Sequence, residues 1–142
     1  MPDLEATVVW DEGLRFTGTG ARSRFPVKLD SSAGGGGFQG ATPTEALLVA
    51  LGGCTGMDVI SILGKMRQEV TAYEVRVRGE QASDHPKVFE ELIVEHRVTG
   101  RNLDTALVEK AVRLSETKYC PVSNTLARGV KVRFTFEVIG GQ

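Results

Sequence analysis

The sequence predicts an α+β fold, because a long apolar helix stands between two groups of strand-like segments. Residues 43–67 carry an apolar run that continues over several helical turns. The segments before and after it alternate apolar and polar side chains, as half-buried strands do. A second, amphipathic helix and a last strand complete the chain. Runs of strands separated from runs of helix are typical of an α+β domain.

The composition is that of an ordinary globular protein. Of the 142 residues, 41% are hydrophobic and 25% are charged, and the formal net charge is −1. We expect a single domain over residues 1–142, built around one hydrophobic core. The near-zero charge offers no broad basic surface for nucleic acid and no polybasic membrane anchor. The first residues are acidic where a signal peptide is basic, so we expect a cytoplasmic protein with reduced thiols.

The N-terminal part predicts a three-stranded meander followed by a loop. Residues 6–10 are predicted as a strand that ends in the Asp-Glu-Gly turn at 11–13. Residues 14–20 and 25–30 supply two more strands. Residues 31–40 contain four consecutive glycines, but no Lys-Ser/Thr pair follows, as a phosphate-binding loop would require. We therefore interpret this tract as a mobile loop.

The central helix is predicted to begin at Pro43 and to end near Arg67. Proline is favoured in the first turn of a helix, where its missing N–H has no partner to lose. The apolar residues spread around more than one face, which indicates a buried helix. The uncharged stretch from Ala46 to Met57 is shorter than the roughly 20 residues that cross a membrane, so we expect a soluble domain.

Three glycines in this helix require an explanation. Each glycine weakens a helix by about 1 kcal/mol relative to alanine. Close approach of another backbone would offset that cost, and the same helix of a symmetry-related copy could supply it. The three are Gly52, Gly53 and Gly56.

The C-terminal part predicts two strands, two helical segments and a closing strand. Its strands are recognised by alternation, and its helical part by an amphipathic pattern that a Cys-Pro pair interrupts. The predicted elements are strands at 72–81 and 88–98, a helix at 103–119 capped by Asp104, a short helix from Pro121 to near Gly129, and a strand at 130–138.

The two cysteines are the candidate functional residues. Cys54 lies inside the central helix, where burial raises the pKa of a thiol, and Asp58 lies one helical turn further on the same face. Cys120 precedes a proline at a helix start, where free N–H groups and the helix dipole favour a thiolate. A lone cysteine usually fills space in a core. The glycines around Cys54 and the proline after Cys120 favour a functional interpretation.

No metal or cofactor is expected. The two cysteines could be combined with His85 and His96 into a zinc site, but the chain has no CxxC or HxxxH spacing. His85 also stands in an Asp-His-Pro turn. Any chemistry is therefore expected to rest on the thiols themselves.

Two motifs resemble those of the OsmC/Ohr superfamily, the osmotically inducible and organic hydroperoxide resistance proteins. The first is TPTEALLVALGGCTGMDVISIL, residues 42–63. The second is KYCPVSN, residues 118–124, followed by Arg128-Gly129. The motifs have the right order and separation, and the resemblance covers essentially the whole chain. The first motif is most similar to the OsmC-like branch, and the second to the peroxidase branches.

This resemblance implies the OsmC-like fold, as an intertwined homodimer with two long antiparallel helices between wrapped sheets. It also implies a thiol peroxidase that reduces organic hydroperoxides. Cys54 would become a sulfenic acid, Cys120 would resolve it as a disulfide, and a dithiol, in this family a lipoylated protein, would restore both thiols. Both sulfurs are then expected at the edge of one apolar cavity. The alternative is a weakly active or non-catalytic protein that senses redox state or binds a small hydrophobic molecule.

The catalytic arginine and glutamate of the family follow a different pattern in this chain. The peroxidases steer an arginine toward the thiolate with a glutamate directly after the proline of an NPE motif, whereas Glu45 comes one place later than that after Pro43. On a straight helix Glu45 is half a turn out of phase with Cys54 and about 13 Å away along the axis. We therefore expect Glu45 to serve the thiol of a partner subunit. Arg15, which follows the first turn, is the candidate arginine. The other arginines of that segment are Arg22 and Arg24.

Overall fold

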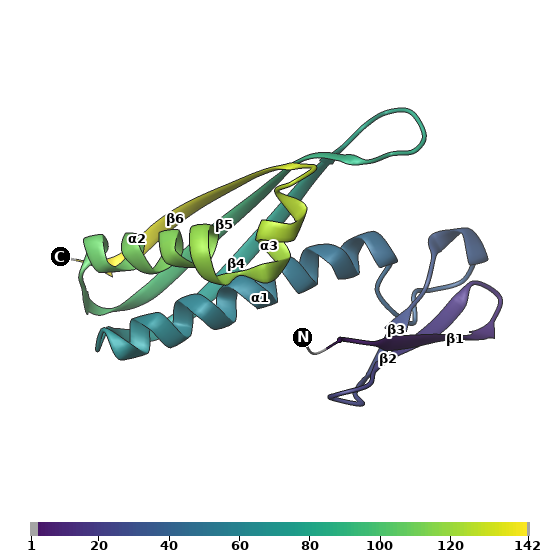
Figure 1. Cartoon of the computed structure of the whole chain (residues 1–142), viewed down its shortest axis with the longest axis horizontal. Helices are drawn as coiled ribbons and strands as arrows, with labels where there is room; N and C mark the ends of the chain where they lie inside the picture. Colours follow the sequence, from purple (N-terminus) through teal and green to yellow (C-terminus); the bar gives the residue numbers. More distant parts are fainter. Residues whose placement is uncertain (1–2, 142) are drawn as a thin grey trace. The chain divides into compact units, whose positions relative to one another are not determined.

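The computed structural model describes residues 3–141 (Figure 1). The chain forms two compact units, the first up to Leu47 and the second from Leu48 onward. The first unit contains a small sheet, and the second contains a larger sheet with its helices. The predicted combination of strands and helices in an α+β fold is confirmed.

The first unit is the predicted meander. Strands β1 (Ala6–Glu12), β2 (Arg15–Gly20) and β3 (Pro26–Leu29) pair antiparallel in sequence order. Gly13 turns the chain between β1 and β2 with φ 54°, a conformation that glycine adopts at little cost. The glycine-rich tract that follows β3 holds one short 3₁₀ turn, Ser32–Gly34.

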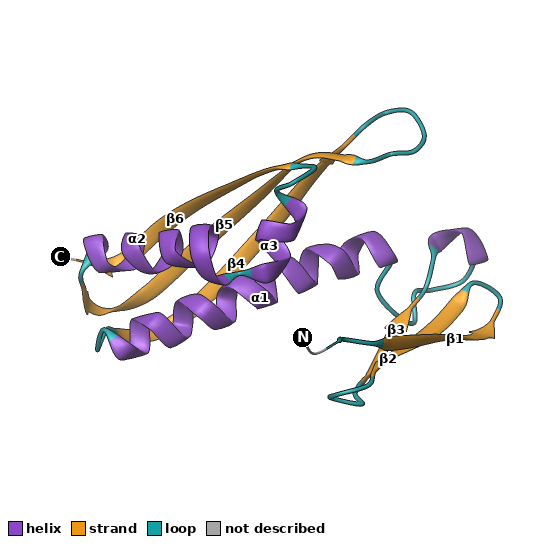
Figure 2. Cartoon of the chain, viewed as in Figure 1, coloured by secondary structure: helices purple, strands orange, loops and turns teal. Residues whose placement is uncertain are grey.

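The second unit contains the three-stranded sheet β4-β5-β6. Strands β4 (Glu69–Gln81) and β5 (Phe89–Leu103) form an antiparallel hairpin with a loop at residues 82–88 (Figure 2). Strand β6 (Lys131–Gly141) pairs with β5 in parallel. A parallel neighbour needs a crossover connection, and the helical segments between β5 and β6 provide it.

Three helices lie on one face of this sheet (Figure 1). Helix α1 (Pro43–Lys65) is followed directly by β4. Helix α2 (Thr105–Leu114) begins at Asp104, whose carboxylate accepts from the N–H groups of Ala106 and Leu107, as predicted for a cap. The chain then winds through one π-helical turn, Ser115–Tyr119, before the short helix α3 (Pro121–Leu126).

The core of the second unit lies between the sheet and these helices. It is apolar almost throughout, as expected for a sheet covered on one face. Its fully buried side chains come from α1, β5 and α2. They are Leu51, Val59, Leu63, Leu92, Val94, Val98, Leu103, Val108, Ala111 and Val112.

Within a single chain, helix α1 is buried along one face only, whereas the sequence predicted a helix buried nearly all round with a second copy of α1 against its glycines. Leu51, Val59 and Leu63 enter the core, but Val49 and Met57 remain 70% and 74% exposed. By length and composition α1 could also cross a membrane, and 28% of its most apolar 18-residue window is buried inside the chain. Its packed face makes it part of the core of the second unit. Its other face is apolar and uncovered within one chain.

Candidate functional site

The two cysteines come together in the second unit, although they are far apart in the sequence. Both are free thiols, and their side chains are hydrogen-bonded to each other. The peptide N–H of Val122 also donates to the sulfur of Cys54. Cys120 is fully buried, and Cys54 is partly exposed. One thiol is thus reachable from solvent and the other lies directly behind it.

Local structure fixes the position of Cys120. Its extended backbone caps α3, and its sulfur accepts from the N–H of Ser123 at 3.3 Å. Pro121 occupies the first turn of α3, where a proline loses no hydrogen bond. On the other side, the N–H of Cys120 donates to the carbonyl oxygen of Ser115 at 2.9 Å. This bond closes the π-helical turn, a feature found often at functional sites.

The surroundings of Cys54 favour its protonated form. Burial raises the pKa of the thiol to about 11, and the Cys120 side chain and the Asp58 carboxylate act in the same direction. The hydrogen bond from the Val122 N–H opposes them by stabilising the thiolate. The direction expected from the sequence is therefore the one found.

A buried polar chain lies beside Cys54. Ser115 donates to Oδ2 of Asp58 at 2.9 Å, and the hydroxyl groups of Thr55 and Ser115 are 2.7 Å apart. Thr55 and Ser115 are both completely buried. Of these three residues, only Asp58 was expected near Cys54 from the sequence, and Thr55 and Ser115 were not. The available signal was a serine on the inner face of an otherwise apolar amphipathic helix.

A second buried polar pair lies in the same unit. The hydroxyl of Tyr73 and Nδ1 of His96 are 2.7 Å apart, and His96 is only 1% exposed. Burial lowers the pKa of His96 to about 4, and the charge of Arg113 acts in the same direction. Burial raises the pKa of Tyr73, and the Asp58 carboxylate adds to that effect. His96 is therefore a neutral core residue in the described fold.

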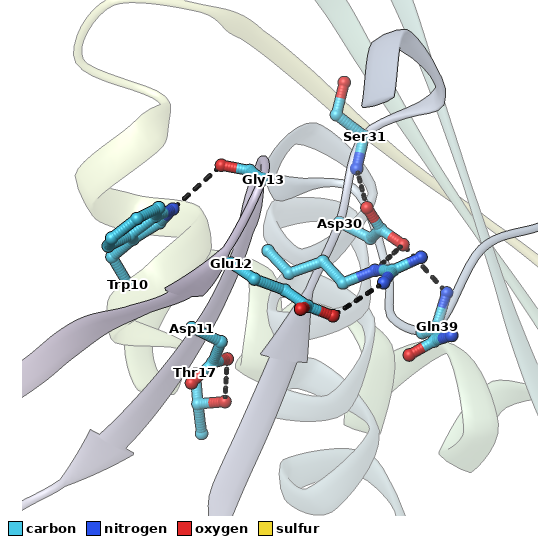
Figure 3. Close-up of polar contacts among 9 residues, drawn as sticks. Trp10, Asp11, Glu12, Gly13, Thr17, Asp30, Ser31 and Gln39 are labelled. Atoms are coloured by element: carbon cyan, nitrogen blue, oxygen red, sulfur yellow. Dashed lines mark hydrogen bonds and ion pairs between the residues drawn. The ribbon is translucent and has the colours of Figure 1, made fainter. Parts of the chain in front are cut away.

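Arg15 has an ion-pair partner inside the first unit. Its Nε lies 3.2 Å from Asp30, and its Nη1 lies 3.3 Å from the exposed Glu12. Asp30 is buried and also accepts from the N–H groups of Ser31 and Gln39 (Figure 3). Those backbone bonds, first that from Gln39, hold its pKa below the ordinary value, and Arg15 contributes further. Arg15 thus helps to anchor the ends of the glycine-rich tract.

The carboxylate of Glu45 also has a local partner. It accepts from the N–H and hydroxyl of Thr42 at 3.2 and 3.0 Å, while the Glu45 N–H donates to the Thr42 hydroxyl. This reciprocal arrangement is a capping box, which stabilises the start of α1. The other candidate arginines, Arg22 and Arg24, are exposed.

A groove of about 600 Å³ runs between α1 and β4. It was expected that both sulfurs would lie at the edge of an apolar cavity, but neither cysteine lines this groove. The three helix glycines line it on one side, because without side chains they leave a depression in the surface of α1. Its other lining residues are Leu48, Val49, Met57, Ile60, Tyr73, Val75 and Val77.

Within residues 3–141, no group of three His, Cys, Asp or Glu side chains is placed to hold a metal ion. His85 and His96 do not join the cysteines in such a cluster. The two free thiols, Cys54 and Cys120, can support the chemistry of a dithiol: oxidation of one sulfur and condensation with the second.

Comparison with known proteins gives the family. The OsmC-like protein family matches residues 34–135. Protein YhfA of Escherichia coli K12 is 39% identical over 136 residues, which cover 96% of this chain and 98% of YhfA. The crystal structure of a hypothetical protein from Aquifex aeolicus superposes with a TM-score of 0.84 at 28% identity, covering 97% of each chain.

A more distant likeness extends to the hydroperoxide resistance proteins. OhrB of Bacillus subtilis, an organic hydroperoxide resistance protein, has a TM-score of 0.63 at 16% identity, over 95% of this chain and 98% of OhrB. At that identity the likeness shows the fold alone. The family match and the similarity to YhfA are sufficient on their own: this chain belongs to the OsmC-like protein family.

Proposed function

We propose that the protein is a cysteine-based thiol peroxidase that reduces organic hydroperoxides. The observation that carries the proposal is the hydrogen-bonded pair formed by the accessible Cys54 and the buried Cys120. OhrB, which has the same fold, is named for resistance to organic hydroperoxides.

In the proposed reaction the thiolate of Cys54 attacks one oxygen of the hydroperoxide. The O–O bond breaks, the alcohol leaves, and Cys54 becomes a sulfenic acid. Cys120 then attacks that sulfur, water leaves, and a disulfide forms. A dithiol such as a lipoylated protein reduces the disulfide by two exchange steps and is itself oxidised to a disulfide. The burial of Cys120 beside Cys54 suits it to this second role, because it meets the sulfenic acid before solvent thiols do.

Glu45 and Arg15 are the proposed supporting residues. An arginine near the thiolate would lower the pKa of Cys54, and a glutamate would orient that arginine. Each already has a structural partner, Thr42 for Glu45 and Asp30 for Arg15. The proposed role therefore requires each residue to interact with the thiol site in addition to its present partner.

We further propose a cytoplasmic homodimer as the active form. Val49 and Met57 expose apolar surface on α1, and the neighbouring groove is lined by glycines that permit close approach of another helix. A second copy of α1 would cover both, as symmetric dimers do with self-complementary patches.

The alternative is a weakly active family member that senses redox state or binds a small hydrophobic molecule. The pKa of Cys54, raised to about 11, favours it, because the reactive thiolate is then scarce at neutral pH. The apolar groove would be the binding site.

Peroxide consumption separates the two functions. Wild-type protein with dihydrolipoamide is expected to consume cumene hydroperoxide faster than hydrogen peroxide, and Cys54→Ser is expected to abolish the activity. A wild-type rate no greater than that of Cys54→Ser would reject the peroxidase and leave the sensing or binding function.

A further inference from the structure

Ser115 is hydrogen-bonded both to α1, the helix that carries Cys54, and to the backbone of Cys120. Its hydroxyl donates to Asp58 and lies 2.7 Å from the hydroxyl of Thr55, both on α1. Its carbonyl oxygen accepts from the N–H of Cys120 at 2.9 Å. Thr55 directly follows Cys54 in the sequence. Ser115 therefore joins the helix that carries one thiol to the turn that carries the other.

The direction of the hydrogen bonds follows from counting protons. A serine hydroxyl has one proton to donate, and the ionised carboxylate of Asp58 can only accept. Ser115 therefore gives its proton to Asp58, and Thr55 must be the donor in the 2.7 Å contact. The hydrogen bonds therefore run in one direction, from Thr55 to Ser115 and from Ser115 to the carboxylate of Asp58. Hydrogen bonds to a charged acceptor are among the stronger ones in proteins.

Because this chain of hydrogen bonds is buried, the loss of any of them is costly. Ser115 and Thr55 are both 0% exposed, so water cannot replace a lost partner without opening the core. Removing the Ser115 hydroxyl would leave the Thr55 hydroxyl without its acceptor and Asp58 without its donor. The contact between α1 and the π-helical turn Ser115–Tyr119 would loosen at the point where the two sulfurs meet.

We propose that Ser115 is a positioning residue that holds the Cys54 and Cys120 thiols at the distance and orientation that disulfide formation requires. It acts through Thr55 and Asp58 on α1 and through the peptide N–H of Cys120 on the π-helical turn. The role rests on the dithiol site of the proposed function, but it concerns the thiol pair alone and does not require that peroxide be the physiological oxidant.

The thiol–disulfide equilibrium in a glutathione buffer measures this role directly. Both protein thiols lose a proton and an electron, the Cys54–Cys120 disulfide forms, and one glutathione disulfide is reduced to two glutathione molecules. The equilibrium constant has the dimension of a concentration and reports how well the protein holds its two sulfurs together. The oxidised fraction is read by alkylation and mass spectrometry.

Ser115→Ala is expected to lower this constant about tenfold, the size associated with losing a buried hydrogen bond to a charged group. That change corresponds to about 30 mV in the two-electron potential. Ser115→Thr, which keeps a hydroxyl and the carbonyl, is expected to remain near wild type. Thr55→Val leaves the bonds of Ser115 to Asp58 and Cys120 in place and is expected to give a smaller decrease.

Leu103→Val is the control for general destabilisation. Leu103 is a fully buried core residue at the end of β5, before α2. The Leu103→Val substitution is expected to lower the melting temperature without changing the thiol–disulfide equilibrium constant. An unchanged constant in Ser115→Ala, or an equal change in Leu103→Val at the same loss of stability, would overturn the positioning role.

The outcome for the proposed function is separate. A wild-type protein that forms the disulfide in glutathione but does not consume hydroperoxide would reject the peroxidase and leave the role of Ser115 standing. A wild-type protein that forms no intrachain disulfide at any glutathione ratio would reject both.

Discussion

The Cys54 and Cys120 side chains are hydrogen-bonded, with Cys54 partly exposed on α1 and Cys120 buried at the start of α3. The two thiols, which are otherwise identical groups, therefore differ in their access to solvent. A reagent from solvent reaches Cys54 first, and any oxidised product there faces Cys120. The order of events in the proposed cycle follows from this difference in access.

Replacing the buried cysteine is expected to stop the cycle after its first step. In Cys120→Ser, one equivalent of cumene hydroperoxide should leave a sulfenic acid at Cys54, because the second thiol is missing. Trapping with dimedone should then give one adduct, identified at Cys54 by peptide mass. Wild-type protein treated identically should give the intrachain disulfide and little adduct. Equal trapping in the two proteins would contradict the resolving role of Cys120.

The charge of Asp58 is expected to slow the reactions of Cys54. Its carboxylate raises the pKa of that thiol, so Asp58→Asn should lower the pKa from its value of about 11. Thiolate increases as pH rises toward the pKa, and a lower pKa therefore means more thiolate at any pH below it. Alkylation of Cys54 by iodoacetamide at pH 8 should become severalfold faster.

The matched control for this substitution is Asp84→Asn, in the exposed loop between β4 and β5. It makes the same chemical change away from α1 and should leave the alkylation rate of Cys54 unaltered. An Asp58→Asn protein with the pH–rate curve of wild type would show that the carboxylate does not act on the thiol.

His96 is expected to make the fold sensitive to mild acid. Its pKa is lowered to about 4 in the folded chain, whereas an exposed histidine has a pKa of about 6.5. Between these values the unfolded chain binds more protons than the folded chain, so stability decreases as pH falls. The full difference is worth about 3 kcal/mol.

Urea unfolding at pH 7 and pH 4.5 measures this loss. His96→Gln cannot gain a proton and should lose less stability between the two pH values than wild type. His85→Gln, in the exposed loop, should behave like wild type. A pH dependence that is the same in wild type and His96→Gln would assign the acid sensitivity to other groups.

The order and type of the elements were predictable because each has a local signal. Pro43 marks the start of α1, and alternation marks β4 and β5. The parallel pairing of β6 with β5 was not predictable, because alternation indicates which face is buried and not the direction of a neighbour. The apolar pattern of α1 predicted burial nearly all round but not which part of it the single chain supplies, since an apolar side chain does not reveal whether its own chain covers it.

The thiol pair was predictable only because two separated motifs resembled one family. Nothing local to Cys54 indicates Cys120. The bond from Ser115 to Asp58 joins residues of different helices, and no spacing rule within one helix reports it. The capping box of Thr42 and Glu45 was visible as a Thr-x-x-Glu pattern before an apolar run. The family resemblance instead implies a role for Glu45 at the thiol.

Glu45→Gln separates these two interpretations of Glu45. Glutamine also serves in a capping box, so the bond to Thr42 and the melting temperature should be largely kept. The negative charge is lost, and if it orients an arginine at a thiolate, the rate of cumene hydroperoxide reduction should fall at least about tenfold. Glu5→Gln makes the same change in an exposed segment outside the site and should leave the rate unchanged. A wild-type rate in Glu45→Gln would limit Glu45 to capping the helix.

The exposed face of α1 predicts a dimer that one substitution should separate. In the single chain, a side chain added at Gly53 meets no atom within 4 Å, so Gly53→Glu fits the isolated fold. Replacing a helix glycine even improves helix propensity, by up to about 1 kcal/mol. Across a homodimer packed on the groove beside α1, the same change would place a charge against apolar surface.

Light scattering tests this expectation. Wild-type protein should have twice the 15.3 kDa mass of one chain, and Gly53→Glu should have the single mass with unchanged far-ultraviolet circular dichroism. Val88→Glu, which adds the same charge to an apolar residue exposed in the β4–β5 loop, should remain dimeric. A monomeric wild type, or a Gly53→Glu protein that stays dimeric, would show that α1 does not form the dimer interface. The apolar groove would then be open to a small hydrophobic ligand in the native protein.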